Sequence, residues 1–136
     1  MEKSMYASVY GTKKKDKIKY KAAYTKKLKK NGELLVDALA GNDKIDFKTC
    51  KFALRIESGK DDIYGGKKSD NIDSGAGNNK IYGYNGSDTI NGGSGNDKIW
   101  DENGNDTVYG GTDSDIIYCD SGYNYILGTK VIIIFS

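Results

Sequence analysis

The chain has 136 residues, 18 of them glycine, and contains neither proline nor histidine. The lack of histidine excludes a His-ligated zinc site and a His-dependent catalytic triad, and the length fits one domain. The net charge of +2 conceals an asymmetry, because residues 1–32 hold eleven lysines against two acidic residues, whereas residues 33–136 hold ten basic and seventeen acidic residues. A cation is therefore expected to bind in the acidic part.

The N-terminal region, residues 1–36, is predicted to be a basic, irregular cap or a set of degenerate first coils. Asn31-Gly32 between two apolar segments favours a hairpin turn, and a short helix over residues 19–30 is the alternative. The lysines of this region lack an apolar stripe, so a solvated face is favoured over binding to nucleic acid or to an anionic membrane. Four aliphatic residues nevertheless lie at multiples of nine residues from one another: Val9, Ile18, Val36 and Ile45.

Residues 37–136 are predicted to form the second region, and its first part enters a nine-residue repeat imperfectly. Residues 40–45 read as a loop and a strand, with Asp43 as a candidate ligand, but Phe52 stands where the next aspartate is expected. Apolar packing is expected to close that turn. Cys50 and Cys119 occupy different positions of the repeat, which favours two buried thiols, and a disulfide between them is the alternative.

The repeat becomes regular from residue 57 onward. Residues 92–100 give its form: two glycines, a serine, a third glycine, Asn-Asp, and an aliphatic residue between two others. A fixed period of this kind indicates a stacked repeat architecture. The aliphatic position recurs at Ile63, Ile72, Ile81, Ile90, Ile99, Val108, Ile117 and Ile126. Two residues before it stand Asp61, Asp70, Asn79, Asp88, Asp97, Asp106, Asp115 and Asn124.

Each nine-residue frame predicts a strand of about three residues with its middle side chain inward, followed by a sharp glycine-rich turn. If two frames make one coil, residues eighteen apart stack about 4.8 Å from one another in two parallel sheets. The expected fold class is therefore all-β, a right-handed parallel β-roll with two nonapeptides per coil. The aspartate positions then form two stacks: Asp61, Asn79, Asp97 and Asp115 on a first edge, and Asp70, Asp88, Asp106 and Asn124 on a second edge.

Stacked carboxylates repel one another unless a cation lies between them. The available ligands are all oxygens, from aspartate side chains and from loop carbonyls, and this donor set suits Ca²⁺ better than zinc or copper. We expect several calcium ions. The candidate ligands are Asp43, Asp61, Gly65, Gly66, Asp70, Gly83, Gly86, Asp88, Gly92, Gly93, Gly95, Asp97, Gly104, Asp106, Gly110, Gly111 and Asp115.

Two frames, residues 92–100 and 110–118, resemble the repeat-in-toxin (RTX) nonapeptide, Gly-Gly-x-Gly-x-Asp followed by x, an aliphatic residue and x. The resemblance extends over residues 57–127. It implies a parallel β-roll in which each calcium ion lies between loops one coil apart. It also implies weaker binding by the loops in which the motif is broken, at Lys68, Asn79, Asp101, Glu102, Asp113, Cys119, Asp120 and Asn124.

An aromatic residue follows the aliphatic residue in every second frame, at Tyr64, Tyr82, Trp100 and Tyr118. These four residues are expected on the outer face of one sheet, and we call them the aromatic ladder. Packing between rings of successive coils is one interpretation. The alternative is a contact surface for a glycan, a partner protein or a second copy of the chain.

The pattern favours a calcium-folded, secreted structural or binding module, or the folding and export module of an RTX protein. Evenly spaced carboxylates are typical of structural ligands, so no enzyme is expected, and the alternative is an accessory or catalytic module of a polysaccharide-modifying enzyme. No apolar leader follows Met1, and no segment is long enough to span a membrane. The resemblance implies type I export through an uncleaved C-terminal signal. Residues 131–136 are a candidate for that signal, and a last strand that caps the core is the alternative.

Overall fold

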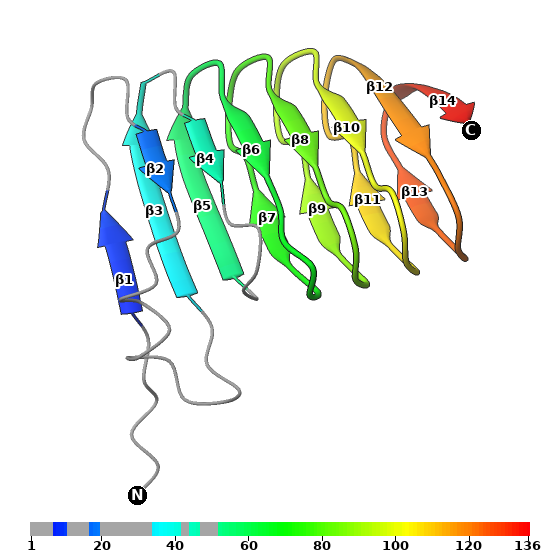
Figure 1. The fold of residues 1–136 in the computed structure, drawn as a ribbon. Helices are drawn as coiled ribbons and strands as arrows, with labels where there is room; N and C mark the ends of the chain where they lie inside the picture. The colour runs from blue at the N-terminus through cyan, green and yellow to red at the C-terminus, as the bar shows by residue number, and fades with distance from the viewer. Residues whose placement is uncertain (1–6, 11–16, 20–33, 42–43, 47–51) are drawn as a thin grey trace, which may run out of the picture.

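A computed structural model describes residues 7–10, 17–19, 34–41, 44–46 and 52–136. These residues form β-strands and contain no helix (Figure 1). Nowhere in the described part of the chain is there a helix long and apolar enough to cross a lipid bilayer. The strands are β1 (Ala7–Tyr10), β2 (Lys17–Lys19), β3 (Leu34–Ala40), β4 (Lys44–Asp46), β5 (Phe52–Ser58), β6 (Asp62–Tyr64), β7 (Asn71–Asp73), β8 (Lys80–Tyr82), β9 (Thr89–Asn91), β10 (Lys98–Trp100), β11 (Thr107–Tyr109), β12 (Ser114–Cys119), β13 (Tyr125–Leu127) and β14 (Lys130–Phe135).

The strands alternate between two seven-stranded parallel sheets, which run side by side along the molecule (Figure 1). One sheet has the order β1-β3-β5-β7-β9-β11-β13, and the other has the order β14-β12-β10-β8-β6-β4-β2. In the regular part, partners are eighteen residues apart, as in the pairs Ile81 with Ile99 and Ile90 with Val108. The predicted β-roll with two nonapeptides per coil is therefore confirmed.

The spacing changes at both ends of the sheets. Val9 pairs with Val36 and Ile18 with Ile45, so the first coil is nine residues longer than the others. The expected turn at Asn31-Gly32, and residues 20–30 of the alternative helix, lie outside the described residues. At the other end, β14 pairs with β12 at a shorter spacing, with Asp115 opposite Val131.

In β6 to β12 the core contains one fully buried aliphatic side chain per strand. In β6 to β11 the middle residue is buried and its two neighbours are half-buried or exposed. This alternation follows from the strand geometry, in which successive side chains point to opposite faces. Among the described residues, the aliphatic side chains with no exposed surface are Ile63, Ile72, Ile81, Ile90, Ile99, Val108 and Ile117.

The turns need glycine because successive coils approach each other closely. Gly93 has a φ of 89°, and a Cβ on it would lie 1.9 Å from the carbonyl oxygen of Gly75. Among the described residues, Tyr84, Glu102 and Asp113 adopt the left-handed conformation without being glycine. Such positions are unusual for residues with a side chain. The sequence motif is thus broken at places where the backbone still keeps the glycine conformation.

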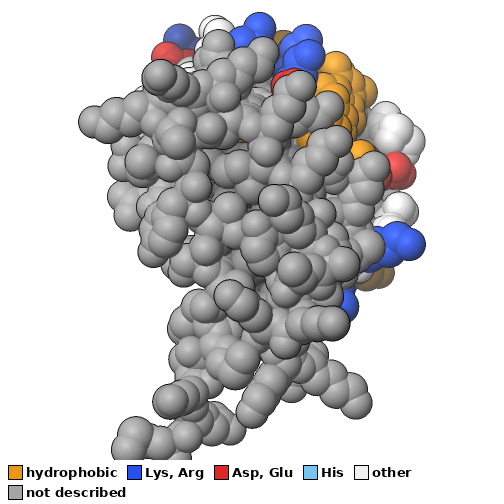
Figure 2. All heavy atoms as spheres, turned by 60° about the vertical axis from the view of Figure 1, so that its left-hand side comes forward, with side chains coloured by type: hydrophobic (Ala, Val, Ile, Leu, Met, Phe, Trp, Pro, Cys, Tyr) orange, Lys and Arg blue, Asp and Glu red, His pale blue; other side chains and the backbone are white. Residues whose placement is uncertain are grey.

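The aromatic ladder forms a continuous stack on the outer face of the even-numbered sheet. Its ring centroids are 5.0, 4.5 and 4.8 Å apart, and neighbouring rings are within 6° of parallel. Figure 2 shows hydrophobic side chains gathered in a patch, with basic and acidic side chains beside it, on the described part of the surface. The stack shows that ring packing occurs. Whether the ladder also contacts a ligand stays a prediction.

Candidate calcium sites

The aspartate at the sixth position of each frame lies at the edge of the roll, just before a strand, and is almost fully buried. One carboxylate oxygen links neighbouring coils by accepting a hydrogen bond from the backbone N–H of the equivalent residue one coil earlier. On the second edge the Asp70 N–H donates to Asp88 Oδ1 at 2.8 Å, and the Asp88 N–H donates to Asp106 Oδ1 at 2.7 Å. On the first edge the Asp97 N–H donates to Asp115 Oδ1 at 3.0 Å. These bonds build the two predicted stacks.

The second carboxylate oxygen is different. In Asp88, Asp97, Asp106 and Asp115 the Oδ2 atom is buried and has no hydrogen-bond partner. Burial of a polar atom without a partner is costly, and a native structure normally supplies one. Asp70 is an exception, because its Oδ2 accepts a hydrogen bond from the Gly66 N–H at 2.7 Å. Both edges therefore hold buried carboxylate oxygens that need a cation or a proton as a partner.

A carbonyl oxygen of the next coil faces the carboxylates of Asp88 and Asp97. The two atoms meet beside the Cα of the first glycine of the frame, in a space that we call the cradle. A Cβ on Gly92 would lie 2.5 Å from the Gly110 carbonyl oxygen and 2.7 Å from Asp97 Oδ2. On the second edge, a Cβ on Gly83 would lie 2.8 Å from both Asp88 Oδ2 and the carbonyl oxygen of residue 101. Only glycine leaves the cradle open.

Burial changes the acidity of these carboxyl groups. It raises the pKa of Asp88 to about 8, with the neighbouring charges of Asp70, Asp106 and Asp101 adding to the effect. The same cause raises the pKa of Asp97 to about 7 and that of Asp106 to about 6. A carboxylate in such a place favours either a bound proton or a bound cation. In an open cradle all the donors are oxygens, which suits Ca²⁺.

A family model agrees with this chemistry. The model of the RTX calcium-binding nonapeptide repeat matches in four overlapping copies, at residues 57–90, 64–99, 82–117 and 91–126. Together the copies cover residues 57–126, which is more than half of the chain. The chain belongs to this RTX repeat family. No curated protein and no solved structure matches the chain.

The protein is thus a calcium-binding RTX β-roll module. Each candidate site has few carboxylate ligands. Within the described residues, no three His, Cys, Asp or Glu side chains lie close enough together to bind one metal ion. An RTX site in this chain therefore has to draw part of its ligands from loop carbonyls, in agreement with the donors that meet in the cradles. Asp43 lies outside the described residues.

The other predicted glycine ligands lie in the loops that stack along the two edges. A Cβ on Gly104 would lie 1.7 Å from the Gly86 carbonyl oxygen, and a Cβ on Gly111 would lie 1.9 Å from that of Gly93. The cradle at Gly65 holds the Gly83 carbonyl oxygen and Asp70 Oδ2. The cradle at Gly110 is different, because the next coil presents a methyl group of Val131 there instead of a carbonyl. The regular stack of the first edge ends at this point.

One RTX loop is closed without a cation. In loop 74–79 a serine occupies the position of the first glycine, and an asparagine occupies that of the aspartate. Ser74 Oγ donates a hydrogen bond to the Gly92 carbonyl oxygen at 2.7 Å, and Asn79 Nδ2 donates to Ser74 O at 3.1 Å and lies 3.3 Å from Ser74 Oγ. Ser74 and Asn79 are both buried. The sequence predicted weaker calcium binding at Asn79, but it did not predict that Ser74 closes the loop. The replacement of glycine by serine at a fixed position of the repeat was the signal that could have indicated this role.

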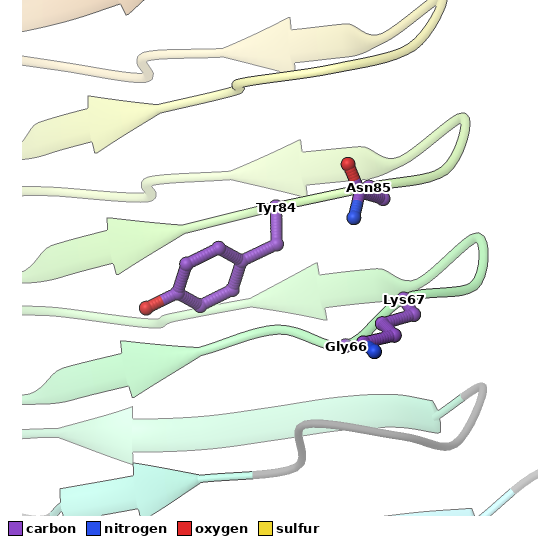
Figure 3. Close-up of a pocket in the computed structure, with 4 residues that line it drawn as sticks. All are labelled: Gly66, Lys67, Tyr84 and Asn85. Carbon is purple, nitrogen blue, oxygen red and sulfur yellow. The ribbon is translucent and has the colours of Figure 1, made fainter.

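A surface cavity of about 240 Å³ lies near the aromatic ladder, lined by Gly66, Lys67, Tyr84 and Asn85 (Figure 3). The ring of Tyr84 points away from Lys67 and Asn85 and packs against Tyr82 at a centroid distance of 6.4 Å. No carboxylate lines this cavity, and of its lining residues only Gly66 is a candidate calcium ligand. The cavity is therefore separate from the carboxylate oxygens of the two edges.

Proposed function

We propose that this module folds when it binds several calcium ions, and that it acts as a secreted structural or binding module or as the folding and export module of a longer RTX protein. The buried, unpartnered Oδ2 atoms of Asp88, Asp97, Asp106 and Asp115 carry this proposal. Without a cation these oxygens oppose burial, and one aliphatic side chain per strand does not offset the chain entropy of the glycine-rich loops. Calcium binding and folding are then one process.

The proposed ligands follow the cradles. On the first edge we assign an ion to the cradle at Gly92, with Asp97 and the Gly110 carbonyl as ligands. On the second edge we assign ions to the cradles at Gly65 and Gly83, with Asp70 and Asp88. Further loop carbonyls complete each shell, from the set Gly66, Gly86, Gly93, Gly95, Gly104 and Gly111. Asp43, Asp61, Asp106 and Asp115 are proposed as ligands on the same repeat pattern.

The extracellular location is also proposed. The calcium affinity expected for such a module is about 0.1 to 1 mM, which is the range of extracellular modules. At the much lower calcium concentration inside a cell the chain would stay unfolded, and an unfolded chain is suited to type I export. The C-terminal residues form β14 at the end of a sheet, and an export signal in this segment would have to act before that strand pairs. Export of the chain from a bacterial host that carries a type I system, compared with a chain shortened at residue 129, tests this part.

Far-UV circular dichroism with and without calcium tests the function itself. We expect a disordered spectrum in EDTA and a β spectrum after calcium is added, with a cooperative transition. Magnesium at the same concentration should not substitute, because it requires a small octahedron and retains its waters. A sample that keeps its β spectrum and its melting temperature in EDTA contradicts the proposal.

A further inference from the structure

Asp101 breaks the RTX motif in a way that adds a buried charge. It occupies the position of the first glycine in its frame, and no part of it is exposed to solvent. Its Oδ1 accepts a hydrogen bond from the Asp120 N–H at 3.0 Å, and its Oδ2 has no hydrogen-bond partner. At the equivalent position of other frames, such as Gly83 and Gly92, a side chain would enter the cradle. Asp101 thus has an unsatisfied carboxylate oxygen buried between two coils.

The surroundings of Asp101 belong to the cradle between loop 101–106 and loop 119–124. Its carboxylate acts electrostatically on Asp106, whose own Oδ2 is buried and unpartnered. Both carboxylates also act electrostatically on the buried thiol of Cys119 in the next coil. Cys119 and Asp120 replace the two glycines of that coil. Two buried carboxylate oxygens without partners therefore lie in one region of the second edge.

This cradle also differs from its neighbours in the next coil. Asn124 stands where the aspartate is expected, and its Oδ1 accepts a hydrogen bond from the Asp106 N–H at 2.9 Å. In the regular cradle at Gly83 one carboxylate oxygen, Asp88 Oδ2, faces the carbonyl oxygen of residue 101. Asp101 adds a second carboxylate to that of Asp106, where the motif alone supplies one. Two carboxylates and loop carbonyls do not amount to a three-acid cluster, in agreement with the absence of such clusters among the described residues.

We propose that Asp101 is a calcium ligand outside the RTX motif, and that it binds an ion together with Asp106 in the cradle between loops 101–106 and 119–124. The broken motif implied weak binding at this place, whereas the proposed ligand gives a site comparable to its neighbours. The inference rests on the proposed calcium-coupled folding. It makes the last coil of the second edge part of the calcium-binding stack.

A purely structural role for Asp101 is the competing explanation, because it also accepts a hydrogen bond from loop 119–124. Two substitutions separate these roles. Asp101→Asn keeps an acceptor at Oδ1 and removes the charge, and Asp101→Gly restores the family motif. Asp120→Asn is the matched control, because it removes one carboxylate from the same edge, in the adjacent coil, at an exposed position.

Isothermal titration with calcium chloride tests the proposal, with circular dichroism in excess calcium as the check that each variant folds. We expect Asp101→Asn and Asp101→Gly each to lose one ion or to bind one ion about tenfold more weakly. Asp120→Asn should match the parent. If Asp101→Gly binds calcium as well as the parent or more tightly, or if Asp101→Asn is unchanged, Asp101 is not a ligand. A parent that binds no calcium would instead contradict the proposed function as a whole.

Discussion

Loop 74–79 and loop 92–97 occupy equivalent places in adjacent coils of the first edge, yet they are closed by different chemistry. In loop 74–79 the side chain of Ser74 fills the cradle and donates a hydrogen bond to the Gly92 carbonyl oxygen. In loop 92–97 the cradle is open, the Gly110 carbonyl oxygen and Asp97 Oδ2 face it, and Asp97 Oδ2 has no hydrogen-bond partner. The same backbone is thus completed by a hydroxyl and an amide in one coil and, in our proposal, by a cation in the next.

If the module binds calcium as proposed, this difference places the calcium dependence in single loops. A hydrogen-bonded loop would then hold its coil edge without calcium, whereas an open cradle would hold it only with a bound ion. Because each coil contacts only its neighbours, the stability of the roll is roughly a sum over coils and interfaces. Loop 74–79 is therefore expected to act as a calcium-independent segment within a calcium-dependent stack.

The largest effect is expected from Asp97→Ala. This change removes a ligand of the open cradle, and it also leaves the buried N–H of Asn79, which donates to Asp97 Oδ1 at 2.8 Å, without an acceptor. The lost hydrogen bond alone should lower the free energy of unfolding by about 1–3 kcal/mol. Isothermal titration should show up to two weakened calcium sites, because Asp97 lies in the middle of its stack. Asp61→Ala, near the start of the regular stack, serves as the comparison and should cost less. Equal losses in both variants would mean that the assignment of ions to the stack is wrong.

The second prediction converts the closed loop into an open one. The double substitution Ser74→Gly and Asn79→Asp gives loop 74–79 the residues of loop 92–97 at both key positions. We expect the variant to bind one more calcium ion than the parent and to need calcium more strongly for folding. The single substitution Ser74→Ala is the control, since it breaks the hydrogen bonds without supplying a carboxylate. An unchanged ion count in the double variant would show that the two loops differ in more than these residues.

A third prediction concerns pH in the absence of calcium. The pKa values of Asp88, Asp97 and Asp106 are raised by burial to about 8, 7 and 6, whereas the unfolded chain has an aspartate pKa of about 3.9. Between the unfolded value of about 4 and the highest folded value of about 8, the folded chain binds more protons than the unfolded chain, so its stability decreases as the pH rises through this range and levels off above it. In EDTA we expect more β structure at pH of about 5 than at about 8. Calcium affinity should change in the opposite direction, because protons compete for the same oxygens. Circular dichroism that shows no gain of structure on acidification would contradict this prediction.

The smallest effect for each lost contact is expected from the aromatic ladder, which runs along both kinds of coil. Replacing Tyr82 and Trp100 by Ser should lower stability by about 0.5–1.5 kcal/mol for each ring pair that is lost. Because neighbouring rings cover each other's faces, only their edges are left for a ligand. A lost contact with a glycan, a partner protein or a second copy, in variant protein that still folds in calcium, would support the contact surface. Unchanged mass by light scattering and unchanged binding in a glycan and partner screen would leave the ladder a structural feature.

The repeat period was sufficient to predict the architecture, since a nine-residue spacing with one inward aliphatic per frame allows few other folds. The buried residues Ile63 and Ile99, and the stacking of Asp97 on Asp115, follow from that spacing alone. The longer first coil could not be predicted from the spacing, because an insertion of nine residues keeps Val9 and Val36 at the same position of the nine-residue repeat. A periodic pattern reports the register of strands but not the number of residues that pass between them.

Individual departures from the motif were harder to interpret than the motif itself. Asp101 and Ser74 both replace a glycine, and from the sequence both suggest a weakened loop. The structure distinguishes them, because the outcome depends on which atoms of the next coil lie opposite. Ser74 has the Gly92 carbonyl oxygen within hydrogen-bond distance, whereas Asp101 has an oxygen that is buried without a partner. A single sequence shows that a glycine is replaced, but not which atoms of the next coil lie opposite the new side chain.

The ring stack also determines how the molecule interacts with light. Trp100 is the single tryptophan of the chain and lies between Tyr82 and Tyr118, at centroid distances of 4.5 and 4.8 Å. At these separations excitation absorbed by the tyrosines passes to the indole, and nearly parallel chromophores couple strongly in the near-ultraviolet. Both signals depend on the alignment of adjacent coils and should decrease when the chain unfolds. The protein therefore contains its own fluorescent reporter of coil assembly at the centre of the ladder.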